Sequence, residues 1–121
     1  MTLRKKTILV ADDDPDILDA VTLILEDAGY EVQTTSDGAT LRDVHSTAPD
    51  LLLLDIWLSG WDGKEVCAVL KSKEQTRDLP IVLFSANKET ERIAHEVGAD
   101  DFITKPFELD DLVQTIERHL Y

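Results

Sequence analysis

The chain has 121 residues and a formal net charge of −13, with 12 Lys and Arg side chains against 25 Asp and Glu. A hydrophobic fraction of 43% with only 5 Gly and 4 Pro argues against a disordered or repetitive chain and indicates one globular domain. Because the charge would repel polyphosphate and anionic lipid, we expect no direct binding of nucleic acid or of a membrane surface.

No stretch of the sequence is typical of a signal peptide or a membrane span. The apolar run that begins at Ile8 ends in aspartates, and the run Leu51-Leu54 is far shorter than the roughly 18 residues that a span needs. The single cysteine, Cys67, cannot form an internal disulfide, which fits a reducing compartment. We therefore expect a cytoplasmic protein.

Strand-like and helix-like segments alternate along the chain. The first strand is predicted at 7–11, and a helical period follows it, with Asp14 as N-cap, Pro15 in the first turn and Gly29 as the stop. The later segments are a strand at 31–35, a weaker helix at 39–46, a strand at 51–54, a helix at 64–74, a strand at 81–84, a helix opened by Asn87 and closed by Gly98, a strand at 102–104 and a helix at 109–120. Five strand–helix units with short links predict a doubly wound α/β domain over residues 1–121, with no output domain in this chain.

Polar side chains follow four of the predicted strands at the point where each strand ends. They are Asp12 and Asp13 after the first strand, Asp55 after the third, Ser85 after the fourth, and Lys105 after the fifth. Open parallel sheets bind their ligands beyond the carboxyl ends of the strands, so this edge is the predicted site.

The residue types at this edge indicate phosphoryl chemistry beside a metal ion. Each pair of carboxylates at about 4 Å repels by roughly 4 kcal/mol at an effective dielectric near 20, so the acids are not there for stability. Oxygen ligands are what Mg²⁺ prefers. Lys105 cannot ligate a metal, but with Ser85 it can hold a phosphoryl group next to Asp55 as nucleophile.

Three ordered motifs resemble the receiver domain of response regulators in two-component signalling, of the chemotaxis-regulator type. They are the segments 8–15, 51–63 and 98–107, and the resemblance covers the chain from Lys6 to Leu120. It implies a flavodoxin-like (βα)5 three-layer sandwich with parallel sheet order 2-1-3-4-5. It also implies that Asp55 accepts a phosphoryl group from the phosphohistidine of a sensor histidine kinase or phosphotransfer protein. Such a domain is a phosphoacceptor switch that catalyses its own phosphorylation and dephosphorylation, and not an enzyme with a separate substrate.

The resemblance assigns further roles at the same edge. Mg²⁺, with Mn²⁺ as an expected substitute, would be held by Asp13, Asp55 and the backbone carbonyl of Trp57, with Asp12 acting directly or through water. Phosphoryl oxygens would be held by Lys105, Ser85 and the backbone amide of Ala86.

The resemblance also implies a switch. Ser85 would move toward the phosphoryl group and Phe102 would change rotamer, altering a face formed by residues 88–97 and 102–120 that binds a downstream protein or a second copy of the chain. The Lys105-Pro106 peptide is expected to be cis, with Pro106 setting the geometry of its loop.

Ser59, Ser85 and Phe102 depart from the usual pattern of the family, although Ser85 keeps the hydroxyl of the commoner threonine. Ser59 stands where proline is common, which predicts a more mobile loop, and Phe102 lacks a tyrosine hydroxyl. Trp57, together with Asn87, predicts restricted access of water to the phosphoryl group and hence slow self-dephosphorylation.

Other functions remain as alternatives. A metal-dependent phosphatase with an aspartyl nucleophile normally has a second acid two residues after the nucleophile, where this chain has Trp57, and a cap for which 121 residues leave no room. A flavin-binding electron carrier needs a Ser/Thr/Gly-rich loop where this chain has Asp12, Asp13 and Asp14. The third alternative is an interaction module of the same fold that is never phosphorylated.

Overall fold

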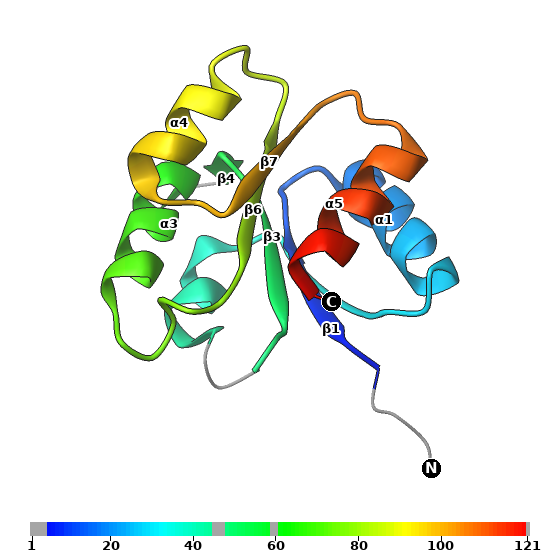
Figure 1. Cartoon of the computed structure of the whole chain (residues 1–121), viewed down its shortest axis with the longest axis horizontal. Helices are drawn as coiled ribbons and strands as arrows, with labels where there is room; N and C mark the ends of the chain where they lie inside the picture. The colour runs from blue at the N-terminus through cyan, green and yellow to red at the C-terminus, as the bar shows by residue number, and fades with distance from the viewer. Residues whose placement is uncertain (1–4, 45–47, 59–60, 121) are drawn as a thin grey trace.

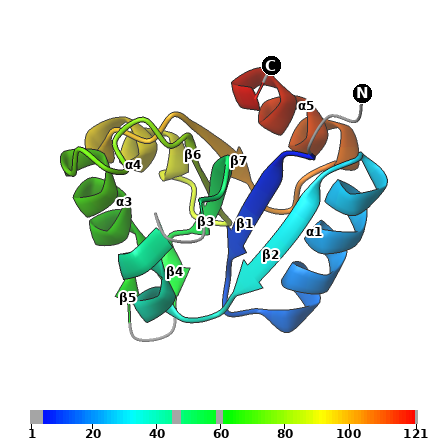
Figure 2. The same cartoon turned by 90° about the horizontal axis from the view of Figure 1, so that it is seen from below.

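The computed structural model describes residues 5–44, 48–58 and 61–120, and its main feature is a sheet of five parallel strands (Figures 1 and 2). In spatial order the strands are β2 (Glu31–Thr35), β1 (Thr7–Ala11), β3 (Leu51–Asp55), β6 (Ile81–Ser85) and β7 (Asp101–Thr104). Counted along the chain, this order is 2-1-3-4-5, which confirms the predicted topology.

Helices cover both faces of the sheet. The elements are α1 (Pro15–Asp27), the 3-10 helix η1 (Gly38–Asp43), α3 (Gly63–Ser72), α4 (Thr90–Val97) and α5 (Leu109–Leu120). Figure 1 shows α1 and α5 on one side of the sheet and α3 and α4 on the other. This arrangement is the expected doubly wound three-layer sandwich.

The core lies in two layers because successive strand residues point to opposite faces. Ile8 and Val10 of β1 join one cluster with residues of α1 and α5, and Leu9 joins the other with residues of α3 and α4. All four leucines of β3 are fully buried. A central parallel strand covered on both faces explains the uninterrupted apolar run.

Capping residues explain where the helices begin and end. The Asp14 side chain accepts the backbone N–H of Asp16 at 2.9 Å, and Gly29 adopts φ 100° after α1. Asp62 caps α3 in the same way, because its carboxylate accepts the N–H of Lys64 at 2.9 Å. Both aspartates satisfy N–H groups that have no partner within the helix.

The prediction of an α-helix at 39–46 is wrong for 39–43, where the chain forms the 3-10 helix η1 at Gly38–Asp43, and is confirmed at Val44, which is α-helical. Glycine and threonine are weak helix formers, and the N–H of Thr40 bonds the carbonyl of Asp37 three residues back. Residues 45 and 46, the end of the predicted helix, lie outside the described residues.

The predicted start of α4 at Asn87 is also wrong, since the helix begins at Thr90. The Asn87 side chain accepts the N–H of Glu89 at 2.8 Å, and its carbonyl accepts the Thr90 hydroxyl. Asparagine therefore forms a turn ahead of the helix, as its side chain commonly does. The predicted stop at Gly98, with φ 79°, is confirmed.

A short hairpin after β3 was not predicted from the sequence. β4 (Trp57–Leu58) pairs antiparallel with β5 (Trp61–Asp62). Strands of two residues are too short to show a period of two. The expected mobility at Ser59 concerns a position outside the described residues.

No helix in the described part of the chain combines the length and the apolar character required to cross a membrane.

Candidate functional site

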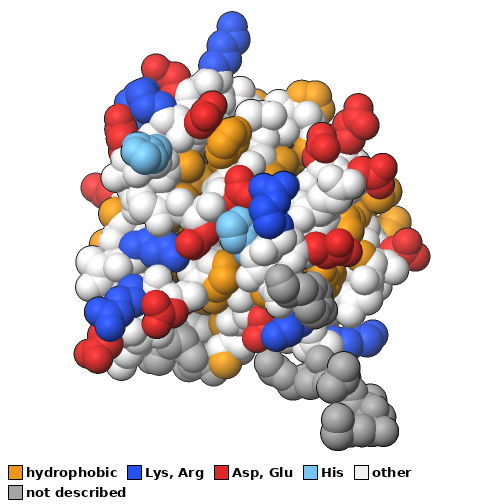
Figure 3. Space-filling view, viewed as in Figure 1, with side chains coloured by type: hydrophobic (Ala, Val, Ile, Leu, Met, Phe, Trp, Pro, Cys, Tyr) orange, Lys and Arg blue, Asp and Glu red, His pale blue; other side chains and the backbone are white. Residues whose placement is uncertain are grey.

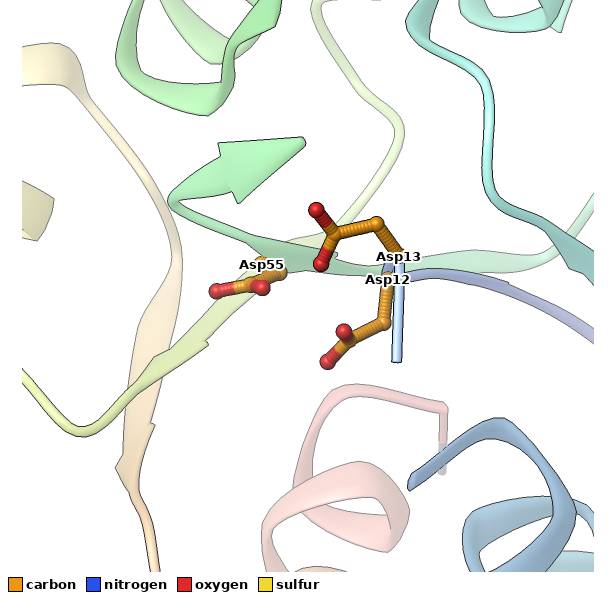
Figure 4. A group of neighbouring side chains, drawn as sticks. All are labelled: Asp12, Asp13 and Asp55. Carbon is orange, nitrogen blue, oxygen red and sulfur yellow. The ribbon is translucent and has the colours of Figure 1, made fainter. Parts of the chain in front are cut away.

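The carboxyl ends of the parallel strands bring the predicted acids together at one edge of the sheet. Asp12 and Asp13 directly follow β1, and Asp55 ends β3, whose residue Leu54 pairs with Ala11. Carboxylate oxygens of the three residues lie within 4.8 Å of one another. Figure 4 shows Asp12 and Asp13 leaving the end of β1 beside the strand that carries Asp55. The predicted acid cluster is therefore present.

Lys105 faces this cluster from the end of β7. Its ammonium Nζ lies 2.7 Å from Oδ2 of Asp12 and 3.6 Å from Oδ2 of Asp55. It also lies 4.4 Å from the centre of the Phe84 ring, a cation–π contact beneath the site. Because Lys105 reaches two of the three acids, it partly offsets their mutual repulsion.

The three acids differ in burial and in their hydrogen bonds. Asp12 is 1% exposed, and its second oxygen accepts the N–H of Asp14 at 2.9 Å. Asp55 is 8% exposed, and the N–H of Trp57 lies 3.5 Å from its Oδ1. The side chain of Asp13 is exposed. Asp12 is thus held from two sides, whereas Asp13 faces solvent.

Burial raises the pKa of the Asp55 carboxyl group from 3.8 to about 6. Lys105 and the Trp57 N–H lower the pKa, while the neighbouring charges of Asp12 and Asp13 raise it. The raised pKa of Asp55 therefore reflects above all the burial of its carboxyl group, which the Lys105 charge offsets only in part.

The donor set fits a hard divalent cation. Three carboxylates face one ammonium, so negative charge remains in excess, and every candidate ligand atom of the cluster is an oxygen. Mg²⁺ takes oxygen ligands and is commonly held by one or two protein carboxylates with water. The residues present therefore fit the expected metal ion.

Of the other predicted site residues, Ser85 and Ala86 lie at the same edge, whereas Phe102 lies inside β7 and pairs with Leu83. Ser85, at the end of β6, is 4% exposed and its hydroxyl oxygen accepts the N–H of Asn87 at 3.1 Å. Ala86, the next residue, is exposed. Phe102 on β7 is partly buried against the core cluster that includes residues of α4. Their roles toward a phosphoryl group stay predictions.

Two loops that border the site have the features expected of them. The Lys105-Pro106 peptide is cis, as predicted. Trp57 is 56% exposed, and the ammonium of Lys64 lies 5.4 Å from the centre of a ring of its indole. The bulky Trp57 side chain, two residues after Asp55, is therefore on the surface, where it can affect the access of water to the site.

Two residues that position the site were not singled out from the sequence. Phe84 supports the ammonium of Lys105, but its sequence context is that of any buried strand residue. A Cβ at Gly63 would collide with the carbonyl oxygens of Asp55 and Ile56, and the Gly63 N–H donates to the Ile56 carbonyl at 2.6 Å. Such close approach depends on the folded loop, so no local pattern reveals it.

Comparison with known proteins agrees with this geometry. The family model for the response regulator receiver domain matches residues 8–117. The DNA-binding response regulator MtrA of Mycolicibacterium smegmatis is 36% identical over 123 residues, a match that covers 99% of this chain and 53% of MtrA. This chain therefore spans about half the length of that relative.

Solved structures show the same architecture. The receiver domain of NtrX from Brucella abortus has a TM-score of 0.84 and 42% identity, covering 93% of this chain and 97% of that domain. The chemotaxis response regulator CheY4 of Vibrio cholerae has a TM-score of 0.87 and 28% identity, covering 97% of this chain and 100% of CheY4.

Proposed function

This chain belongs to the response regulator receiver domain family, and on that premise we propose that it is a phosphoacceptor switch of a two-component system with Asp55 as the acceptor. One observation carries the proposal above the others: Asp55 lies in a cluster of three acids and within 3.6 Å of the Lys105 ammonium. A nucleophile, an oxygen-rich cation site and a fixed positive charge are what phosphoryl transfer to a carboxylate requires.

The proposed step moves one phosphoryl group from a phosphohistidine to Asp55. A carboxylate oxygen of Asp55 forms a bond to phosphorus, and the phosphorus–nitrogen bond of the donor breaks. The electron pair of that bond stays on the imidazole nitrogen, which is then protonated. The Lys105 ammonium, already beside Asp55, would hold a phosphoryl oxygen as charge develops on it.

Mg²⁺ is the proposed cofactor, and Mn²⁺ its expected substitute. Asp13, Asp55 and the backbone carbonyl of Trp57 would hold it, with Asp12 acting directly or through water. When bound, the ion supplies positive charge that lowers the repulsion between the acids and an incoming phosphoryl group. Oδ2 of Asp12 already forms an ion pair with the Lys105 ammonium at 2.7 Å. This contact supports a less direct role in metal binding for Asp12 than for Asp13.

Phosphorylation would be transmitted through Ser85 and Phe102. The Ser85 hydroxyl and the backbone amide of Ala86 would bind further phosphoryl oxygens, and the vacated space would admit the Phe102 ring. Ser85 now accepts the N–H of Asn87, so its movement would alter the loop that leads into α4. The proposed output face, residues 88–97 and 102–120, would then bind a downstream protein or a second copy of this chain.

The proposed donor is a sensor histidine kinase or a phosphotransfer protein. MtrA is a DNA-binding response regulator, but the net charge of −13 gives no support for DNA binding by this chain itself. We propose that any effect on transcription passes through a partner or through a segment outside these 121 residues.

The test is intact mass after incubation with acetyl phosphate, with and without Mg²⁺. The expected result is a Mg²⁺-dependent gain of one phosphoryl group that is lost in Asp55→Asn and retained in Asp78→Asn, an exposed acid far along the chain. Lys105→Met is expected to slow the gain strongly. If the chain bound Mg²⁺, as shown by tryptophan fluorescence, yet gained no mass, the phosphorylation-independent interaction module would replace this proposal.

A further inference from the structure

A pocket separate from the acid cluster lies between η1, the β4–β5 hairpin and α3. Its volume is about 440 Å³. The lining comprises Gly38 and Leu41 of η1, Trp61 of the hairpin, and Glu65, Val66, Val69 and Leu70 of α3, with Lys73 beyond the end of α3. Figure 2 shows these three elements together at one end of the molecule.

The pocket exists because η1 is a short 3-10 helix that packs closely on Trp61. A Cβ at Gly38 would collide with the Trp61 side chain, so only glycine lets the η1 backbone approach the indole. Leu41 and Leu70 are 1% and 2% exposed and form the inner part of the lining, whereas Val69 is 47% exposed. An aromatic plane and aliphatic side chains thus border a hollow that is open to solvent.

The charges around the pocket favour an anion at one end. Lys71 is neutralised by Asp100, whose Oδ2 lies 2.6 Å from its ammonium. Lys73 is exposed and makes no ion pair with a carboxylate in the described ranges. Among the described residues that line the pocket, Lys73 is the one cationic side chain and Glu65 the one anionic side chain.

Glu65 lies two helical turns before Lys73 and has the opposite charge. It would repel an anionic group at its own end of the pocket and so direct that group toward Lys73. The pocket therefore has an aromatic wall, an apolar interior, and side chains of opposite charge at its two ends, Glu65 and Lys73.

We propose that this pocket binds small aromatic anions, with the rings against Trp61 and Val69 and the anionic group on Lys73. The volume lies within the roughly 300–1,000 Å³ of small-molecule sites, which are typically apolar with a few placed polar groups. The site does not use Asp55, so the inference is independent of the proposed phosphoryl transfer.

The test uses two fluorescent probes that share an aromatic body and differ in charge. One is 1-anilinonaphthalene-8-sulfonate, an anion, and the other is the neutral N-phenyl-1-naphthylamine. Because the chain has two tryptophans, Trp57→Phe leaves Trp61 as the only tryptophan donor, and excitation selective for tryptophan avoids the two tyrosines. In this background the sulfonate is expected to bind with energy transfer from Trp61, and more tightly than the neutral probe.

Substitutions then separate the apolar and ionic contributions. Lys73→Gln is expected to weaken binding of the sulfonate by about fourfold, as for one partly solvated ion pair, and to leave the neutral probe unchanged. Val69→Glu is expected to weaken both probes, and its fold is checked by circular dichroism. Lys64→Gln is the matched control, because Lys64 is on α3 but does not line the pocket.

Three results would overturn the proposal. If neither probe showed energy transfer from Trp61, or if Val69→Glu left both affinities unchanged, the pocket would not be the site of binding. If the probes bound equally well and Lys73→Gln had no effect, the pocket would be an apolar surface without selectivity for anions, suited to a side chain of a protein partner.

Discussion

At the residue scale, two demands conflict at Asp55. A nucleophilic carboxyl group must be ionised, yet burial raises its pKa to about 6 against 3.8 in the unfolded chain. Between these values the folded state binds more protons than the unfolded state, so the free energy of unfolding falls as pH rises. Above about pH 6 the full cost of ionising Asp55 is present, and below about pH 4 it is absent.

Asp55→Asn is therefore expected to stabilise the Mg²⁺-free protein at pH 7.5 by on the order of 1 kcal/mol, because the neutral amide avoids the cost of ionising a buried carboxyl group. The difference from the wild type should vanish at pH 4. Urea unfolding in EDTA at both pH values measures it, with Asp78→Asn as the exposed control. A gain of equal size at pH 4 would show that ionisation of Asp55 is not its cause.

Trp57 is the residue expected to set how long the phosphorylated state lasts. Its exposed indole follows the acceptor by two positions and has the Lys64 ammonium 5.4 Å from its ring. Trp57→Asn is expected to open a path for water and to speed loss of the phosphoryl group by roughly tenfold, about 1.4 kcal/mol of barrier. Decay of the phosphorylated form, followed by mass, measures this. An unchanged rate in Trp57→Asn, with Trp61→Phe as control, would contradict it.

Residues of the site differ in how far the sequence predicts them. Asp12, Asp13 and Asp55 were predictable because each follows a strand, and parallel strands end at one edge. Phe84 and Gly63 were not predictable, because their contributions are a ring beneath Lys105 and a close backbone approach. Both depend on tertiary contacts that leave no local pattern.

At the scale of elements, Lys71 and Asp100 join the end of α3 to the start of β7. The Lys71 ammonium donates to the carbonyls of Arg77 and Leu79 and to Asp100 Oδ2, at 3.2, 2.8 and 2.6 Å. Asp100 Oδ2 also accepts the N–H of Ile81 at 2.8 Å. The Lys71–Asp100 pair thus connects α3, the loop that follows it and the starts of β6 and β7.

Asp100→Ala is expected to lower the free energy of unfolding by about 2 kcal/mol, since it removes two hydrogen bonds and leaves Lys71 without its counter-charge. Urea unfolding measures the change. Arg92→Ala is the matched comparison, because it removes two exposed ion pairs, one to Glu96 within α4 and one to the N-cap Glu89, and is expected to have no measurable effect. Equal losses in the two variants would show that the Lys71–Asp100 contact has no special structural role.

The elements that the sequence predicted well are those with strong local signals. The five strands and α1 carried apolar periodicity, with Asp14 and Gly29 marking the helix ends. The errors lie where tertiary contacts decide, as at η1, where Gly38 meets Trp61. The start of α4 was misplaced because the Asn87 side chain accepts the N–H of Glu89 two residues on, the same bond that the N-caps Asp14 and Asp62 make, so the sequence does not distinguish this turn from a helix start.

At the scale of the whole molecule, the charge is unevenly distributed. Every charged side chain between residues 12 and 37 is acidic, whereas residues 63–79 mix both signs. In Figure 3 acidic side chains gather at the right, where Figure 1 places α1 and α5. Like charges on one face repel in the folded state, and salt screens this repulsion over about 10 Å at 0.1 M.

Raising NaCl from 0.05 to 0.5 M is therefore expected to stabilise the protein by on the order of 1 kcal/mol, about 4 °C in Tm for a chain of this size. In the double variant Asp19→Asn/Glu26→Gln, on the exposed face of α1, the same rise in NaCl should stabilise the protein less, because part of the charge repulsion has been removed. Glu74→Gln/Asp78→Asn, in the mixed segment, should keep the full increment. Thermal unfolding at both salt concentrations measures all three proteins. If salt stabilised both double variants equally less than the wild type, the repulsion would come from the net charge of the chain and not from the α1 face.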